Sequence, residues 1–224
     1  MKLYNLLVTI ILISAMPAFS QDAQTPAEKE AAYTRTITAR AEKIVANLHI
    51  TDAGKSARLT TIIADQYRNL NNIHTLRDEQ VKALKSSGAD KDAIAQKGKD
   101  LEDNTNKQLA QLHERYISQL STELTVAQVD EVKNGMTYGV LPITYRGYLD
   151  MIPTLKEEQK QQIMTWLVEA REHAMDAESS EKKHWWFGKY KGRINNYLSA
   201  AGYDLKKEGD AWEKRRQEAK NKAN

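Results

Sequence analysis

The sequence predicts an all-α protein in which a long antiparallel helical hairpin precedes a C-terminal cluster of shorter helices. Apolar residues recur at the three- and four-residue spacing of an amphipathic helix over most of the chain. No stretch alternates apolar and polar residues for long enough to make a convincing strand. Only 4 prolines and 10 glycines occur among 224 residues, so few positions interrupt a helix. The fold class follows from these three observations.

The first twenty residues have the layout of a secretory signal peptide. An apolar run covers residues 6–16, and small residues follow at Ala18 and Ser20, the positions that a signal peptidase recognises. The run is shorter than the roughly 20 residues that a membrane-spanning helix needs. We therefore expect residues 1–20 to be removed and residues 21–224 to form a periplasmic or secreted protein with no stable membrane insertion.

Composition and charge exclude several kinds of stabilisation, anchoring and partner. The absence of cysteine excludes disulfides and a lipid-modified cysteine anchor. With 33 basic and 30 acidic residues, the chain is nearly neutral, and no global attraction to nucleic acid is expected. A single domain with two lobes, residues 25–121 and 124–224, is expected because no Gly-, Ser- or Pro-rich linker separates them.

The N-terminal lobe is predicted to contain three helices. Residues 25–28 form a capping box that opens the first, which ends around residue 49. Thr51 is the predicted N-cap of the second. Residues 86–90 (SSGAD) end that helix and cap a third over about residues 91–120. Two helices of roughly 30 residues joined by so short a turn pack antiparallel, as a hairpin about 45 Å long.

The C-terminal lobe is predicted to contain shorter helices. A capping box at residues 125–128 opens a short helix, which runs into an irregular apolar loop over residues 138–143. Another short helix and a longer one are expected over residues 144–174. A further helix, capped by a serine at position 179 or 180, is expected to end at Gly202.

Aromatic residues are concentrated in the C-terminal lobe, where eleven of the 16 lie from residue 138 onward. Residues 184–193 (HWWFGKYKGR) place three aromatic residues side by side. Successive residues of a helix point about 100° apart, so the three rings cannot all face one side. Exposed indole and phenol rings beside Lys, Arg and Asn suit a sugar, because the C–H face of a pyranose stacks on an aromatic ring. The alternative is that Trp185, Trp186 and Phe187 fill the seam between the lobes.

Two clusters of candidate ligand-binding residues follow from this distribution. The first surrounds the tryptophan pair and contains Trp185, Trp186, Lys189, Tyr190, Arg193, Asn195 and Asn196. The second surrounds the apolar loop and contains Tyr138, Tyr145 and Arg146, near glycines that let a backbone approach a ligand. The alternative for the second cluster is a loop tucked between helices. An oligosaccharide or polysaccharide is the expected partner.

No motif of an enzyme or a metal site stands out. A phosphate-binding glycine loop, a dinucleotide fingerprint and a hydrolase nucleophile elbow are all missing, so neither a catalytic residue nor a cofactor is predicted. Glu169, His173 and Asp176 share one helix face at metal-ligand spacing. With 28% charged residues, however, the chain produces such triplets by chance, and no metal is predicted. His74 lies on a polar flank of the second helix, where a buried network between helices is expected.

Four stretches resemble one known family over nearly the whole mature chain. They are residues 63–74 (IADQYRNLNNIH), 134–150 (NGMTYGVLPITYRGYLD), 166–176 (WLVEAREHAMD) and 184–205 (HWWFGKYKGRINNYLSAAGYDL). These are similar to the exported family called domain of unknown function 3826. The resemblance implies an origin in polysaccharide-degrading Bacteroidota and, at most, sugar binding. The family brings no established catalytic or binding residues.

A shorter pattern supports a rival function. Leu124, Thr125 and Gln128 match the LTxxQ pattern of periplasmic stress chaperones built from long helical hairpins, although a capping box alone requires Thr and Gln at this spacing. The sequence therefore predicts a non-enzymatic carbohydrate-binding protein. A helical chaperone or scaffold is the alternative, and an enzyme that acts on a sugar is the second alternative, since paired carboxylates abound. The oligomeric state is left open.

Overall fold

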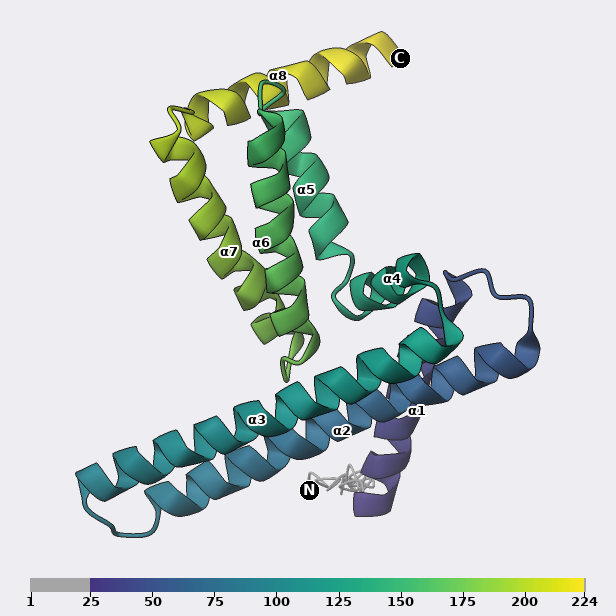
Figure 1. The fold of residues 1–224 in the computed structure, drawn as a ribbon, viewed down its shortest axis with the longest axis vertical. Helices are drawn as coiled ribbons and strands as arrows, with labels where there is room; N and C mark the ends of the chain where they lie inside the picture. The colour runs from purple at the N-terminus through teal and green to yellow at the C-terminus, as the bar shows by residue number, and fades with distance from the viewer. Residues whose placement is uncertain (1–24, 224) are drawn as a thin grey trace, which may run out of the picture.

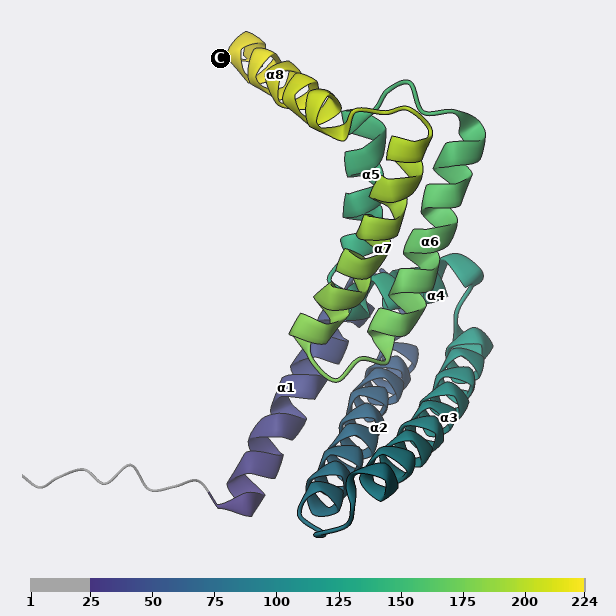
Figure 2. The same cartoon turned by 90° about the vertical axis from the view of Figure 1, so that its left-hand side faces the viewer.

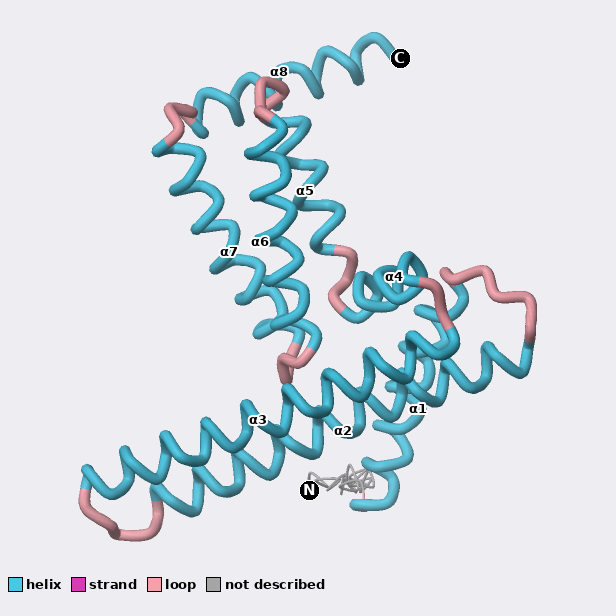
Figure 3. The backbone as a smooth tube through the Cα atoms, viewed as in Figure 1, coloured by secondary structure: helices cyan, strands magenta, loops and turns pink. Residues whose placement is uncertain are grey.

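The computed structural model describes residues 25–223, and over this range the chain forms eight helices and no strand (Figures 1 and 3). The all-α prediction is confirmed. The predicted signal peptide, residues 1–20, lies outside the described residues. None of the helices in the described part of the chain combines the length and the apolar character needed to cross a bilayer.

Three helices form the N-terminal lobe: α1 (Pro26–Ala46), α2 (Ala53–Lys85) and α3 (Lys91–Glu123). α2 and α3 are antiparallel, and α1 packs across α2 (Figure 1). The capping box predicted for α1 is present, since the Thr25 hydroxyl accepts a hydrogen bond from the Glu28 amide and the Glu28 carboxylate accepts one from the Thr25 amide. The N-cap of α2 is Asp52 and not the predicted Thr51, because the Asp52 carboxylate accepts from the Lys55 amide.

Two short helices, α4 (Val126–Met136) and α5 (Val140–Met151), follow the hairpin. The prediction of an irregular loop over residues 138–143 is wrong, because most of this stretch is the first turn of α5. Tyr138 and Gly139 make the tight turn between the two helices, with positive φ angles of 60° and 64°. Pro142 does not break α5, because the backbone N–H that proline lacks has no partner inside the first turn of a helix.

The rest of the C-terminal lobe consists of α6 (Glu157–Met175), α7 (Ser180–Ala200) and α8 (Leu205–Ala223). α6 and α7 lie side by side against α5, and α8 crosses the far end of this bundle (Figures 1 and 2). Ser179 caps α7. Gly202, two residues after the end of α7, has a φ of 95° that lets the Tyr203 amide donate back to the Leu198 carbonyl, which is the predicted stop signal.

The buried apolar residues form two separate clusters. One joins α1, α2, α3 and α4 and includes Leu59, Ile63 and Tyr116. The other joins α5, α6 and α7 and includes Leu167 and Phe187. α6 reaches both clusters, because Met175 at its last turn packs in the first cluster while most of the helix packs in the second. The two lobes therefore meet at α4 and at the end of α6.

The contact of α1 with α4 gives a stability prediction. A Cβ added at Gly135 of α4 would lie 2.8 Å from Cγ1 and 3.2 Å from Cγ2 of Ile44. Packed carbon atoms do not approach so closely, so Gly135→Ala is expected to lower the free energy of unfolding by about 1–3 kcal/mol, the usual cost of overpacking. Urea denaturation followed by circular dichroism measures this change.

Gly188→Ala on α7 is the matched control. A Cβ at this exposed helical position has no atom within 4 Å, so alanine is expected to raise the free energy of unfolding by up to about 1 kcal/mol. Equal effects of the two substitutions would contradict the close packing of α4 on α1.

Candidate functional site

A groove of about 620 Å³ lies between the hairpin and the connection from α6 to α7. The volume is in the range of clefts that hold small ligands. We call it the tryptophan groove. From α2 and α3 it is lined by His74, Arg77, Glu102 and Asn106, and from α6 and α7 by His173, Asp176, Lys182, Trp185 and Trp186.

The three adjacent aromatic residues of α7 divide between groove and core. Trp185 is 53% exposed, whereas Phe187 is only 1% exposed and packs in the second apolar cluster. Trp186 is half-buried and meets Trp185 edge to face, with ring centroids 5.0 Å apart and an interplanar angle of 76°. The structure therefore leaves one indole open to solvent at a groove, and the three rings do not all fill the seam between the lobes.

Other side chains hold the tryptophan pair in place. The His173 imidazole stacks on Trp186 with centroids 4.3 Å apart and an interplanar angle of 14°. The Lys189 ammonium lies 4.9 Å from the Trp186 centroid and 5.5 Å from that of Trp185. Trp186 is thus a supported wall of the groove, and Trp185 is its accessible platform.

Polar side chains at and near the end of α6 join the lobes beside the groove, and two of them, His74 and Asp176, also line it. The His74 Nε2 donates to the Asp176 carbonyl oxygen at 2.7 Å, and the His113 Nδ1 donates to Asp176 Oδ2 at 2.9 Å. Asp176 therefore ties α6 to both helices of the hairpin. We call the following set the polar joint: His74, His113, Arg171, Glu172, Asp176 and Lys183.

Two cations of the polar joint bind α4: Arg171 binds side chains along the helix, and Lys183 binds the carbonyl oxygen of its last residue. Arg171, which is 5% exposed, donates to Asp130 Oδ1 at 2.6 Å and to Asn134 Oδ1 at 3.0 Å. The Lys183 ammonium donates to the carbonyl oxygens of Met136 at 3.3 Å and Met175 at 3.2 Å. Met136 and Met175 are the last residues of α4 and α6, where the helix dipole favours a positive charge.

The carboxylates of the joint stabilise a charged histidine. Hydrogen bonds to Asp176 and Glu172 raise the pKa of His113 to about 9. Burial alone would raise the pKa of Glu172, but hydrogen bonds from His113 and Lys133 outweigh burial and hold this pKa at about 2. The Lys133 ammonium lies 2.8 Å from Glu172 Oε2. His113 is thus an imidazolium between two carboxylates.

A comparison with family models identifies the family of this chain. Residues 34–218 match the model of a family described as a protein of unknown function, DUF3826. The chain belongs to the DUF3826 family. The match extends from α1 into α8, so it includes both lobes and every residue that lines the tryptophan groove. No curated protein matches the chain.

In this DUF3826 protein, the residues predicted around the tryptophan pair do not form one surface. Trp185, Trp186 and Lys189 come together at the groove. Tyr190 is buried behind it, with its ring centroid 6.2 Å from that of His173. The other three lie farther along α7.

None of those three lines the groove. Arg193 covers the Trp166 ring at 4.5 Å and lies 3.5 Å from the Glu169 carboxylate. Asn195 accepts a hydrogen bond of 2.7 Å from the Tyr148 hydroxyl, in a shallow cleft between α5, α7 and α8. Asn196 is exposed on α7.

The second predicted cluster is also divided. Tyr138 stacks on His184 of α7, with centroids 5.6 Å apart, on the other side of the α6–α7 connection. Tyr145 packs on the apolar cluster of α5, α6 and α7, and Arg146 is exposed. Neither Tyr145 nor Arg146 lines the tryptophan groove.

The metal-like triplet has other contacts. Glu169 faces Arg193, His173 stacks on Trp186, and Asp176 binds His113. Among the described residues, no group of three side chains converges as a metal site would require.

The hairpin wall of the groove was not predicted from the sequence. The one signal for it was the polar flank at His74, a residue that is buried between the lobes as expected.

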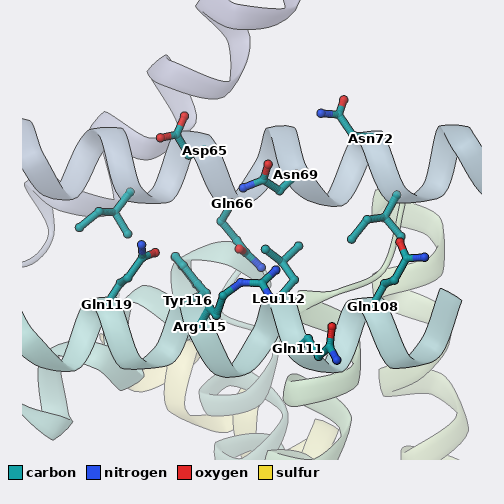
Figure 4. A pocket seen from close by; sticks show the side chains of 12 residues that line it. Asp65, Gln66, Asn69, Asn72, Gln108, Gln111, Leu112, Arg115, Tyr116 and Gln119 are labelled. Atoms are coloured by element: carbon teal, nitrogen blue, oxygen red, sulfur yellow. The ribbon is translucent and has the colours of Figure 1, made fainter. Parts of the chain in front are cut away.

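A second groove, of about 470 Å³, runs along the hairpin between α2 and α3 (Figure 4). Its rim is formed by Asp65, Asn69, Asn72, Gln108, Gln111, Arg115 and Gln119. Its one aromatic side chain, Tyr116, is 1% exposed. This groove therefore presents amides and charges but no aromatic platform.

The polar joint predicts how stability depends on pH. The folded pKa of His113, about 9, lies above the value of about 6.5 in an unfolded chain. Its stabilisation is therefore fully present below about pH 6.5 and is lost as the pH rises through 9. An NMR titration of the His113 imidazole is expected to give a pKa near 9.

His113→Gln provides the comparison. The free energy of unfolding of the parent is expected to fall relative to that of the variant between about pH 6.5 and pH 9, by on the order of 2 kcal/mol. A His113 pKa near 6.5, or parallel pH profiles of parent and variant, would show that the imidazolium does not bind the two carboxylates.

Proposed function

We propose that the tryptophan groove binds an oligosaccharide and that this protein is a non-enzymatic carbohydrate-binding protein. The observation that carries the proposal is an exposed indole, Trp185, at the edge of a groove of about 620 Å³. A pyranose ring offers an apolar C–H face that stacks on an indole. Its hydroxyl groups need hydrogen-bonding side chains within reach of the stacked ring.

The hairpin supplies such side chains opposite the indole. Arg77, Glu102 and Asn106 line the hairpin wall, and Lys182 lies beside Trp185 with its ammonium 6.0 Å from the ring centroid. Donors and acceptors therefore surround the platform. Because Trp186 and His173 support Trp185 from behind, little side-chain ordering is needed on binding.

The alternatives have less support. A helical chaperone needs a continuous apolar surface on the hairpin, whereas the hairpin groove of Figure 4 is rimmed by amides and charges. An enzyme that acts on a sugar needs a pair of free, converging carboxylates. Of the three carboxylates that line the groove, Asp176 is bound to His113 and Glu178 lies 3.7 Å from Arg77, which leaves Glu102. Periplasmic or secreted localisation remains part of the proposal and rests on the signal-peptide pattern of residues 1–20.

Trp185→Ala tests the platform. Isothermal titration calorimetry against a panel of neutral and acidic plant oligosaccharides is expected to find a ligand for the parent protein. The variant is expected to bind that ligand at least about tenfold more weakly, which corresponds to about 1.4 kcal/mol of lost stacking. Trp185→Phe, which keeps an aromatic face, is expected to bind with intermediate affinity.

Trp212→Ala is the matched control, because Trp212 lies on α8 in the cleft with Asn195 and does not line the tryptophan groove. It is expected to leave the affinity unchanged. Circular dichroism checks that each variant, at the exposed Trp185 or at the half-buried Trp212, retains the helicity of the parent. The proposal fails if no saccharide of the panel binds at millimolar concentration, or if Trp185→Ala binds as tightly as the parent.

A further inference from the structure

A smaller cavity, distinct from the hairpin groove, lies on the opposite side of the α6–α7 connection from the tryptophan groove. It has a volume of about 220 Å³, and Ala177 and Glu178 of the connection line both cavities. α1, α2 and the first turns of α7 enclose it, and Figure 2 shows the start of α7 beside α1. We call it the cationic pocket. The residues on which the argument depends are Tyr33, Arg40, Tyr67, Tyr138, Ser180 and Lys183.

Lys183 is a buried cation without an anionic partner. Its side chain is 6% exposed, and no carboxylate of the described residues lies within salt-bridge distance of its ammonium. An ammonium has three donors. Two reach the carbonyl oxygens of Met136 and Met175, which leaves one donor without an acceptor in the described part of the protein. A buried charge without a counter-ion is costly, so the pocket would gain from an anion.

The charges around Lys183 also favour an anion in the pocket. Burial lowers the pKa of Lys183 to about 8, Asp176 opposes this shift, and the positive charge of Arg40 adds to it. Burial raises the pKa of the Tyr67 phenol to about 12, and the positive charge of Arg40 partly opposes this rise. Two cations thus face one small cavity.

Neutral donors complete the pocket. The Tyr67 hydroxyl makes no hydrogen bond to the described residues, while the Tyr33 hydroxyl is used on the Tyr67 carbonyl oxygen at 3.1 Å. Ser180 is the first residue of α7, a helix of 21 residues. Ser179 accepts hydrogen bonds from the Lys182 and Lys183 amides, so the Ser180 and Glu181 amides are the N–H groups of this first turn that are left for an anion.

We propose that the cationic pocket binds a small oxyanion, a carboxylate or a phosphate group. Arg40 and Lys183 supply the charge, and the Tyr67 hydroxyl and the start of α7 supply neutral donors. A volume of about 220 Å³ is below that of clefts for drug-sized ligands, so it suits such a group and not an oligosaccharide. The acidic residue at its edge, Glu178, lies 3.7 Å from Arg77, which lines the tryptophan groove. This site does not depend on sugar binding in the other cavity.

Calorimetric titration of the full mature protein with sodium acetate and with sodium phosphate, at constant ionic strength in chloride, tests the proposal. Binding of at least one of the two ions in the millimolar range or tighter is expected. A preference for acetate identifies a carboxylate site, and a preference for phosphate identifies a phosphate site. Binding of neither ion overturns the proposal.

The protonation of Lys183 provides a second readout. An anion beside the ammonium raises the pKa of Lys183 above its value of about 8 in the free protein. At pH 8.5 binding is therefore expected to take up protons, which titrations in two buffers of different ionisation enthalpy detect. The other titratable groups that line the pocket are Tyr33, Arg40, Tyr67, Tyr138 and Glu178, and Asp176 also acts on the pKa of Lys183. Binding of acetate without proton uptake would exclude Lys183 as the partner.

Variants separate specific binding from a general salt effect, since phosphate stabilises most proteins by exclusion from their surface. Arg40→Gln, at an exposed position, is expected to weaken binding at least fivefold. Arg35→Gln is the matched control, because Arg35 is also exposed on α1 but does not line the pocket. A folded Lys183→Met variant is expected to lose binding. Because Lys183 also joins the ends of α4 and α6, its loss could unfold the protein, and Arg40→Gln is therefore the decisive variant. Equal affinities of the parent and Arg40→Gln contradict the proposal.

Discussion

The hydrogen bonds of Asp176 link the two lobes of this DUF3826 protein at the end of α6. The first apolar cluster already joins the hairpin to α4 and to the last turn of α6, and beside Met175 the hydrogen bonds of Asp176 add a polar contact between α6 and the hairpin. Asp176 binds His74 of α2 through its backbone and His113 of α3 through its side chain. Apolar packing tolerates small rotations of one surface on another, whereas hydrogen bonds between buried charges have a defined geometry. Our hypothesis is that the polar joint contributes orientation more than stability, because burying these charges costs solvation energy.

The position of α7 after this link produces both the tryptophan groove and the cationic pocket. α7 starts directly after the connection that follows Asp176, so its first turns are placed between the hairpin and α1. Residues two positions apart on a helix point about 200° apart. Lys183 and Trp185 therefore face opposite sides of α7, the first toward the cationic pocket and the second toward the tryptophan groove. One short segment thus supplies an electrostatic site and an aromatic site.

Local signals made the helices predictable, and distant contacts were not predictable. The capping boxes at Thr25 and Thr125, the turn at Gly88 and the stop at Gly202 involve residues a few positions apart, and the structure contains each of them. The wall opposite Trp185 comes from α2 and α3, about a hundred residues earlier in the chain, and helical periodicity does not say which faces of distant helices meet.

The grouping of the candidate residues illustrates the same limit. Trp186 and Asn195 are nine residues apart on α7, which is about 180° of rotation, so they point to opposite faces. Closeness in sequence suggested one site, and the rotation of the helix makes two. The exposed Trp185 could be inferred only as one of three adjacent rings, because the choice depends on which face of α7 packs against α6.

A distance measurement between the lobes tests the role of the polar joint most directly. The chain has no native cysteine, so Asp103→Cys on α3 and Asn196→Cys on α7, both exposed, can carry a specific pair of spin labels. Double electron–electron resonance is expected to give one narrow distance distribution for the labelled parent. With Asp176→Ala added, a broad distribution at unchanged helicity is expected. A distribution that stays equally narrow without the Asp176 carboxylate would contradict this account.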